Sequence, residues 1–182
     1  MHFQFRGQAK SGFSSIMTEA DKEKMIYSLG VKYIFAPDFS DFKDMSGREF
    51  FEKILLEEMN AKALSCGEDF RFGKNAECGA GELKKLCDEY SVTLQVIPKV
   101  KLNGEDVSST RIRQAVLNGD MPLAQKLLTK PFTIDFKVIS GRKLGRRINA
   151  PTINQAFDDG FLIPQFGVYA TVTEIDGKFY PS

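Results

Sequence analysis

Apolar side chains recur at helical spacing in three stretches of the first half of the chain. Residues three or four apart lie on one face of an α-helix, so these stretches are expected to form amphipathic helices. The first stretch follows Thr18 and ends at Gly30, and the second follows Ser46; Thr18 and Ser46 are of residue types that cap helix N-termini. The stripes consist of Met25, Ile26 and Leu29, then of Phe50, Phe51, Ile54, Leu55 and Met59, and finally of Leu83, Leu86, Cys87 and Tyr90.

Short apolar runs follow these predicted helices. Val31–Ala36, Ala61–Cys66 and Val92–Ile97 have the length and composition of buried strands, and a proline closes the first run and the last. Helices that alternate with such strands predict a mainly parallel sheet with helices on its faces. The first half of the chain is therefore expected to be α/β.

Two further helices are predicted before the pattern changes. Asn118–Gly119 ends the first of them, and Asp120 caps the second, which has Pro122 in its first turn. Their apolar stripes are Ile112, Ala115 and Val116 in the first and Ala124, Leu127 and Leu128 in the second.

From Phe132 onward the apolar residues alternate with polar ones. Phe132, Ile134, Phe136 and Val138 have the period of two that predicts a half-buried strand. Val168–Ile175 reads as another strand, and the Asp176–Gly177 turn is typical of a hairpin to a third strand that begins at Lys178.

The change of period at Thr129–Pro131 predicts a boundary between a domain at 1–129 and an antiparallel β domain at 130–182. So few strands cannot close a sheet or bury both of its faces. We therefore expect the sequence to be cut from a longer one.

Composition narrows the function classes. The 182 residues are 42% hydrophobic and 27% charged, which excludes wholesale disorder, and the net charge of +1 argues against a protein that coats nucleic acid. No apolar run approaches the roughly 18 residues of a membrane span, and Met1–Arg6 lacks the apolar core of a signal peptide. We expect a cytoplasmic protein with neither nucleic acid nor membrane as its partner; the oligomeric state stays open.

The three cysteines signal no special chemistry. Cys66, Cys78 and Cys87 are odd in number and contain no CxxC pair, so neither a disulfide framework nor a zinc site is indicated. They are expected to be reduced, partly buried thiols.

Val107–Arg113 is the first segment with candidate chemistry. Ser108, Ser109 and Thr110 stand where a helix begins, and free N–H groups together with the helix dipole make such a start an anion site. Arg113 lies one turn along, where its guanidinium can return to a phosphate at the tip. The alternative is plain N-capping by Ser108 or Ser109 with solvated arginines.

The second segment is Gly67–Gly73, directly after a predicted parallel strand. Ligands of open α/β sheets bind at the carboxyl ends of strands, and Asp69 can accept hydrogen bonds from a ligand hydroxyl or base. The aromatic residues of this segment can equally pack inward, with the glycines turning the chain.

The third segment is Gly141–Arg147 with Pro151–Asn154. Its glycines and cations suit a loop whose backbone N–H groups approach phosphate oxygens, although GxxxxGK[ST] is absent. Thr152 and Asn154 stand two apart, so in an extended segment their oxygens face one way and can share a Mg²⁺ ion. The alternatives are a solvated turn or a basic nucleic-acid patch, as in an RNA-binding protein.

Together these segments resemble the bacterial bifunctional riboflavin kinase/FAD synthetases. Gly67–Gly73 is similar to the family's GxDFxFG stretch, and Val107–Arg113 to its ISSTxxR motif, with Val for Ile. Gly141–Asn154 resembles GxxLGRxxGxPTxN, with Asn149 in place of a glycine, and Phe166–Ala170 resembles the strand that follows. The resemblance runs from about Thr18 to the end.

The resemblance implies a nucleotidyltransferase-like, Rossmann-like α/β domain and the start of a riboflavin kinase β-barrel. It implies that riboflavin and ATP give FMN, and that FMN and ATP give FAD and pyrophosphate, with Mg²⁺. For the adenylyl-transfer site it implies that Ser109, Thr110 and Arg113 hold the ATP phosphates and that Asp69 lines the site. For the kinase it implies that the nucleotide loop is lined by Gly141, Lys143 and Gly145, with Thr152 and Asn154 at Mg²⁺ and ATP.

Two family features have no counterpart in this sequence. The family's HxGH motif is absent, since His2 is the single histidine, and Glu174 does not match the kinase's glutamate base. The catalytic residues therefore stay unassigned. We expect a fragment of a longer enzyme that is inactive by itself; the alternative is a degenerate, catalytically inactive nucleotide- or flavin-binding module.

Overall fold

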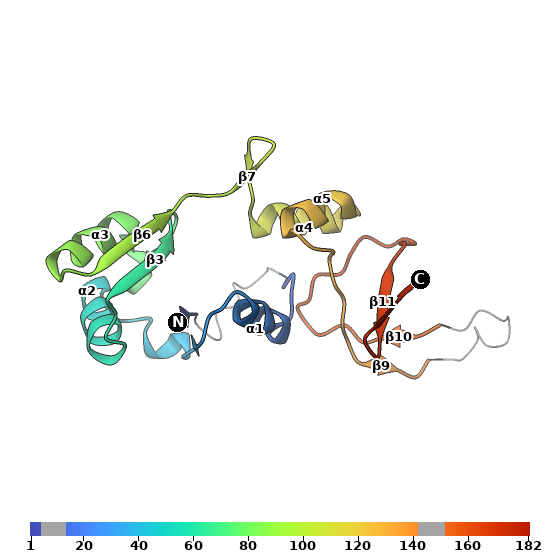
Figure 1. The fold of residues 1–182 in the computed structure, drawn as a ribbon, viewed down its shortest axis with the longest axis horizontal. Helices are drawn as coiled ribbons and strands as arrows, with labels where there is room; N and C mark the ends of the chain where they lie inside the picture. Colours follow the sequence, from blue (N-terminus) through green and yellow to red (C-terminus); the bar gives the residue numbers. More distant parts are fainter. Residues whose placement is uncertain (5–13, 142–151) are drawn as a thin grey trace. The chain divides into compact units, whose positions relative to one another are not determined.

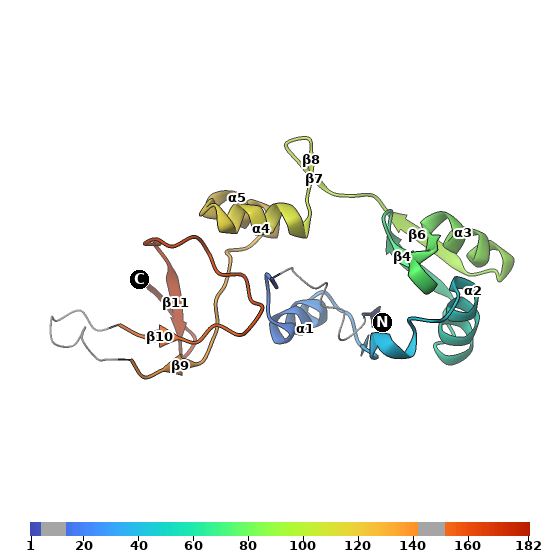
Figure 2. The ribbon, with the colours of Figure 1, turned by 180° about the vertical axis from the view of Figure 1, so that it is seen from behind.

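The computed structural model describes residues 1–4, 14–141 and 152–182. Figures 1 and 2 show their helices and strands from two opposite sides. The chain divides into two compact units. The first comprises Met1–Gly12 with Glu19–Val107, and the second comprises Phe13–Thr18 with Ser108–Ser182. This division falls between Val107 and Ser108 and does not test the domain boundary predicted at 129/130, which stays a prediction.

The described helices of the first unit match the predicted order. They are α1 (Glu19–Ser28), α2 (Gly47–Glu49), the π-helix η2 (Phe50–Glu58) and α3 (Ala80–Glu89), with short 3₁₀ turns η1 (Phe39–Asp41) and η3 (Lys74–Ala76). Ile26 is the one member of the first predicted stripe that is buried, whereas Met25 and Leu29 are exposed. Neighbouring residues on a helix point about 100° apart, so the inward turn of Ile26 leaves Met25 outside.

The second predicted helix begins at Ser46, as expected, and continues in a form that the pattern did not predict. Ser46 Oγ accepts a hydrogen bond from Glu49 N at 3.2 Å, and Glu49 Oε2 accepts one from Ser46 N at 3.0 Å, which is a capping box. From Phe50 to Glu58 the helix is a π-helix, and its C-cap residue Met59 donates from its backbone N to Ile54 O. Apolar pairs four residues apart fit an α-helix and a π-helix alike, so the sequence pattern could not separate them.

Among the residues that the structure describes, the strands of the first unit form four two-stranded ladders. β3 (Ala63–Gly67) pairs in parallel with β6 (Thr93–Ile97), and β1 (His2–Phe3) pairs in parallel with β2 (Ile34–Phe35). Two antiparallel ladders, which were not predicted, join β4 (Arg71–Phe72) to β5 (Cys78–Gly79) and β7 (Lys101–Leu102) to β8 (Glu105–Asp106).

The parallel pairing is compatible with the predicted α/β class, but the described strands form separate pairs in place of one mainly parallel sheet, and strand burial was overestimated. On β3, Leu64 and Cys66 pack against the core while Ala63 and Ser65 are exposed. α3 lies against β6 of this pair (Figure 1). The alternating burial along β3 shows that every second side chain points away from the core. The strand predicted at 31–36 is reduced to Ile34–Phe35, because its described partner β1 has two residues.

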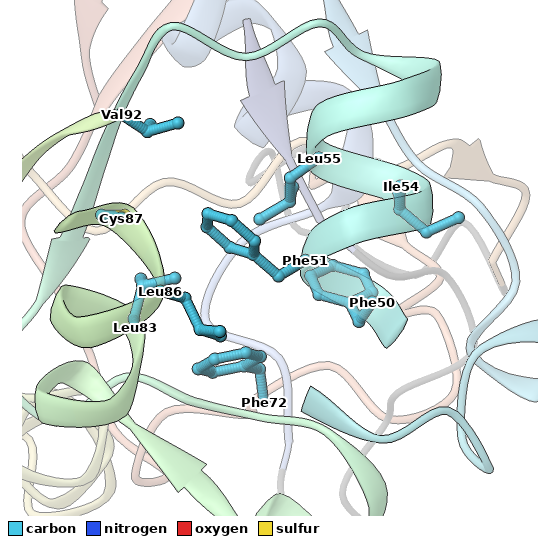
Figure 3. Close-up of a cluster of buried hydrophobic side chains, with 9 residues drawn as sticks. All are labelled: Phe50, Phe51, Ile54, Leu55, Phe72, Leu83, Leu86, Cys87 and Val92. Atoms are coloured by element: carbon cyan, nitrogen blue, oxygen red, sulfur yellow. The ribbon is translucent and has the colours of Figure 1, made fainter. Parts of the chain in front are cut away.

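A single cluster of buried apolar side chains forms the core of this unit (Figure 3). η2 and α3 supply most of it, and the fully buried ring of Phe51 lies between the side chains of the two helices. The cluster consists of Phe50, Phe51, Ile54, Leu55, Phe72, Leu83, Leu86, Cys87 and Val92. The predicted stripes of the second and third helices therefore do face the core. At their ends, Met59 is partly buried and packs against the cluster, and the ring of Tyr90 has its centroid 5.7 Å from that of Phe51 although Tyr90 is partly exposed.

The second unit contains the two helices predicted for 108–128. They are α4 (Ser109–Leu117) and α5 (Met121–Leu128). Gly119 between them has φ +72°, and Asp120 Oδ1 accepts a hydrogen bond from Leu123 N at 3.0 Å, so the predicted cap of α5 is confirmed.

The strands of the second unit are shorter than the period-two pattern predicted. β9 (Val138–Ile139) pairs antiparallel with β10 (Asn154–Gln155), and residues 132–137 are not strand. Instead, aromatic packing holds this segment: the ring of Phe136 lies 4.7 Å from that of Phe161 and 5.2 Å from that of Phe157. The strand predicted over 132–138 is therefore wrong except at its last residue.

The last predicted hairpin is present, with a shorter first strand. β11 (Val172–Ile175) pairs antiparallel with β12 (Lys178–Pro181) across Asp176 and Gly177, whose φ angles of +50° and +74° suit a two-residue turn. Val168–Thr171 lies outside the strand, contrary to the prediction. The antiparallel pairs are compatible with the expected β domain, and the barrel itself stays a prediction.

Candidate functional site

The loop after β3 carries Asp69, the candidate acceptor in the first unit. Glu68 N donates to Ile97 O at 3.0 Å, which extends the β3–β6 pairing by one step, and Asp69 follows at the carboxyl end of the strand. The Asp69 side chain is 70% exposed, and its Oδ2 lies 3.5 Å from Lys99 Nζ. The predicted acceptor is thus at the strand edge and open to a ligand.

A hollow of about 320 Å³ lies beside this loop. It is lined by residues 68–71 and 79–82, so the N-terminus of α3 forms its other side. Glu82 caps that helix by accepting a hydrogen bond from Gly79 N at 3.0 Å, and this bond lowers the pKa of the Glu82 carboxyl. Half of the lining residues are charged, namely Glu68, Asp69, Arg71 and Glu82.

The two aromatic residues of the loop behave differently. Phe72 is buried in the core cluster, whereas Phe70 is partly exposed and stacks on it with ring centroids 5.6 Å apart. Inward packing, the alternative to a binding role, therefore holds for Phe72. It does not describe Asp69, which faces solvent.

Backbone conformation and close packing require a glycine at the last position of this loop, which the sequence pattern did not reveal. Gly73 has φ +77°, and a Cβ there would lie 2.7 Å from Gly47 N. That same Gly47 N donates to Glu77 Oε1 at 2.8 Å, and the thiol of Cys78 packs over Gly47. Burial and the neighbouring Glu77 and Glu82 raise the pKa of Cys78. Glu77 thus ties the loop to the start of α2, a role that no motif signalled.

The second segment begins α4 in the second unit. Ser108 is the N-cap, and its Oγ accepts a hydrogen bond from Arg111 N at 3.2 Å, so the capping alternative is correct for Ser108. Ser109 and Thr110 occupy the exposed first turn, which contains no acidic residue. Capping by Ser108 leaves the hydroxyls of the next two residues for another role.

Arg113 lies one turn further along the same helix and is half-buried. Its Nε donates to Ser14 O at 2.7 Å, which anchors one side of the guanidinium within the second unit. An anchored guanidinium has few side-chain conformations to lose on binding a planar or phosphate oxygen group.

The third segment is described at its two ends. Gly141 and Asn154 lie together, because a Cβ at Gly141 would clash with Asn154 Nδ2. Asn154 stands in β10 opposite Ile139, and Thr152 precedes that strand; both side chains are exposed. Lys143 and Gly145 lie outside the described residues.

The predicted site residues therefore form separate groups. Ser109, Thr110 and Arg113 share α4, and Gly141 contacts Asn154, all within the second unit. Asp69 belongs to the first unit. Among the described residues, no group of three or more His, Cys, Asp or Glu side chains is arranged to hold a metal. No helix within the described ranges is long and apolar enough to cross a membrane.

Comparison with known families defines the class of protein. Residues 3–111 match the FAD synthetase family, and residues 128–182 match the riboflavin kinase family. A nucleotidyltransferase-like domain thus precedes a riboflavin kinase domain in this chain. The chain belongs to the FAD synthetase family, and the resemblance seen in its motifs is confirmed.

Individual relatives agree with this family. A bifunctional riboflavin kinase/FMN adenylyltransferase of Bacillus subtilis is 32% identical over 177 residues, which are 96% of this chain and 55% of the relative. The protein of the same name from Escherichia coli K12 is 34% identical over 152 residues, 82% of this chain and 48% of the relative. The chain spans about half the length of these curated relatives.

A solved structure shows the same fold. A Streptococcus pneumoniae protein, described as a macrolide-efflux protein, superposes with a TM-score of 0.85 at 31% identity. The match covers 98% of this chain and 60% of that one.

Proposed function

We propose that this chain works in flavin cofactor biosynthesis, as part of a bifunctional riboflavin kinase and FMN adenylyltransferase. The observation that carries the proposal is the order of two family matches in one chain, FAD synthetase at 3–111 and riboflavin kinase at 128–182. The reactions are the transfer of a phosphoryl group from ATP to riboflavin, giving FMN, and the transfer of AMP from ATP to FMN, giving FAD and pyrophosphate. The proposed location is the cytoplasm.

In the adenylyl-transfer site, the start of α4 would bind the ATP phosphates. The backbone N–H groups of the first turn and the hydroxyls of Ser109 and Thr110 are donors, and the guanidinium of Arg113 adds a positive charge. Within the first unit, the exposed carboxylate of Asp69 would accept a hydrogen bond from a hydroxyl or base of a substrate. Such transfers depend on alignment and charge neutralisation more than on a covalent nucleophile.

In the kinase site, Gly141, Lys143 and Gly145 would line the nucleotide loop. Thr152 and Asn154 offer a hydroxyl and a carboxamide oxygen, and Mg²⁺ prefers such hard oxygen donors and commonly binds one or two protein groups plus substrate phosphates. These residues therefore fit the ion, which when bound neutralises phosphate charge. The clash that a Cβ at Gly141 would make with Asn154 explains a glycine at that position, since a side chain would displace the carboxamide.

One substitution tests the two-site assignment. The protein, in the full length that its gene encodes, is incubated with ATP and Mg²⁺ and with either riboflavin or FMN, and the flavins are separated by chromatography. Asn154→Ala should stop FMN formation and leave the conversion of FMN to FAD intact, whereas Arg113→Ala should do the reverse. If each variant lost both activities, the assignment of separate sites would be wrong.

A wild-type protein that binds ATP and flavin without turnover would contradict the enzymatic proposal. Such a result would identify a nucleotide- and flavin-binding module instead.

A further inference from the structure

Lys99 occupies a position that none of the sequence motifs includes. Gly67 and Ile97 are the last registered pair of β3 and β6, and Asp69 and Lys99 each stand two residues beyond that pair. Asp69 lies in the tight turn that Phe70 N closes by donating to Gly67 O at 3.1 Å, and Lys99 follows the end of β6. The two parallel strands therefore deliver a carboxylate and an ammonium group to one place.

Lys99 bridges two separate segments of the first unit. Its Nζ lies 3.5 Å from Asp69 Oδ2 in the loop after β3, and 3.6 Å from Asp106 Oδ2 at the end of β8. The base of the β7–β8 hairpin is closed by Val107 N, which donates to Val100 O at 2.8 Å. The ammonium group thus joins the Asp69 loop to the base of that hairpin.

The other oxygen of the Asp69 carboxylate lies near the backbone of Gly67. This oxygen is Oδ1, and a Cβ added at Gly67 would be 3.2 Å from it. Lys99 Nζ pairs with Oδ2, and Oδ1 lies in the space that the missing side chain of Gly67 leaves. These two contacts favour one orientation of the carboxylate, although the Asp69 side chain is 70% exposed.

We propose that Lys99 is a positioning residue that sets the orientation of Asp69 for the substrate of the adenylyl-transfer site. The inference rests on the proposed function, because it takes Asp69 to contact that substrate. Lys99 itself is compensated by two carboxylates, so it acts through Asp69 and does not bind phosphate. An ion pair between exposed groups contributes little to folding, but a fixed acceptor saves the cost of ordering it when the ligand binds.

The chain offers a matched control for this proposal. Lys101 lies 4.0 Å from the same Asp106 and is not paired with Asp69 in any described contact. Lys101→Met therefore removes the same charge from the same hairpin. Lys99→Arg keeps a cation in reach of both carboxylates.

Calorimetric titration with ATP and Mg²⁺ is the first measurement. Lys99→Met should weaken ATP binding by about two- to fivefold, as expected for loss of an exposed ion pair, while Lys99→Arg and Lys101→Met bind as the wild type does. In an Asp69→Asn background, Lys99→Met should have no further effect, because the coupling runs through the carboxylate. Equal affinities of Lys99→Met and wild type, or an undiminished loss in the Asp69→Asn background, would overturn the proposal.

A second measurement needs no ligand, so it separates this proposal from the proposed function. Hydrogen exchange of the Glu68 and Phe70 amides, which donate to Ile97 O and Gly67 O, reports how firmly the Asp69 loop is held. Exchange should be faster in Lys99→Met than in wild type, Lys99→Arg or Lys101→Met. If the wild type did not bind ATP but this pattern held, the proposed function would fail and the positioning of the loop would stand. Unchanged exchange in Lys99→Met would refute the positioning itself.

Discussion

The core cluster of the first unit and the β11–β12 hairpin of the second unit were both predicted from regularly spaced apolar residues, but they differ in how far these residues are buried. In the first, η2 and α3 bring Phe51 and Cys87 out of contact with solvent. In the second, β11 and β12 leave most of their apolar side chains exposed, and Phe166 and Val168 before them are 96% and 103% exposed. The difference teaches that a periodic pattern shows which side of an element is apolar, and that packing partners decide how much of the element forms.

The largest expected effect tests this comparison through stability. Phe51→Ala should lower the free energy of unfolding by about 3–5 kcal/mol, because it removes a fully buried ring and leaves a cavity among the residues of Figure 3. Urea unfolding followed by circular dichroism measures the loss. Val168→Ala is the control and should change stability by less than about 0.5 kcal/mol. Similar losses in both variants would erase the distinction between the two regions.

The next effect concerns α4, the part of the second unit that forms as the sequence predicted. Arg113→Ala should weaken ATP binding about ten- to a hundredfold, since a lost charge-assisted hydrogen bond costs roughly 1.5–3 kcal/mol. Arg111→Ala removes the same charge from the same helix and should bind nearly as the wild type does. Calorimetric titration compares the variants.

Unfolding curves must accompany this titration, because Arg113 also donates to Ser14 O. Loss of affinity in a variant that is folded at the working temperature supports the phosphate site. Equal affinities of Arg113→Ala and wild type would remove it.

A comparison of two glycines separates backbone strain from close packing in the first unit. Gly73 and Gly30 both have positive φ, +77° and +86°, but a Cβ at Gly73 would meet Gly47 N at 2.7 Å whereas one at Gly30 meets nothing within 4 Å. Gly30→Ala should cost about 1–2 kcal/mol of stability through strain alone. Gly73→Ala should cost about 1–3 kcal/mol more, through overpacking. Equal costs would mean that Gly47 can yield.

The sequence predicted those features that depend on residues close together in the chain, and it failed for those that depend on distant residues. Caps act within three residues, so Ser46, Ser108 and Asp120 were predictable from local sequence and are confirmed. Strand length depends on a distant partner, so the short strands at Ile34–Phe35 and Val138–Ile139 were not predictable from period alone.

The same distinction holds for the candidate site. The motifs marked Asp69 and the start of α4 from spacing along the chain. Lys99 contacts Asp69, and Glu77 contacts Gly47; in each pair the two residues are about 30 positions apart in the sequence, so only the folded structure brings them together.

The smallest expected effect concerns an exposed network that joins α2 and η2 to the end of α3. Arg48 forms a bidentate pair with Glu89, at 2.9 and 2.8 Å, and donates to Glu52 Oε1, which also accepts from Tyr90 Oη at 2.6 Å. The hydrogen bond from Tyr90, followed by that from Arg48, lowers the pKa of Glu52, and the bond from Arg48 lowers the pKa of Glu89. A carboxyl whose pKa is lower in the folded state adds stability above its unfolded pKa and loses it as pH falls through the folded value.

Stability of the wild type should therefore decline as pH falls below the ordinary glutamate value of 4.5. In Arg48→Met the decline should be shallower, because Glu89 then titrates nearer its ordinary pKa and Glu52 keeps only the bond from Tyr90. Urea midpoints at about pH 7 and about pH 3 measure the two slopes. Lys53→Met is the control: Lys53 pairs with Glu49 at 3.5 Å, whose pKa is lowered chiefly by Ser46, so its slope should stay close to that of the wild type. If Arg48→Met and the wild type lost stability in parallel, the network would be a surface contact without a part in holding η2 against α3.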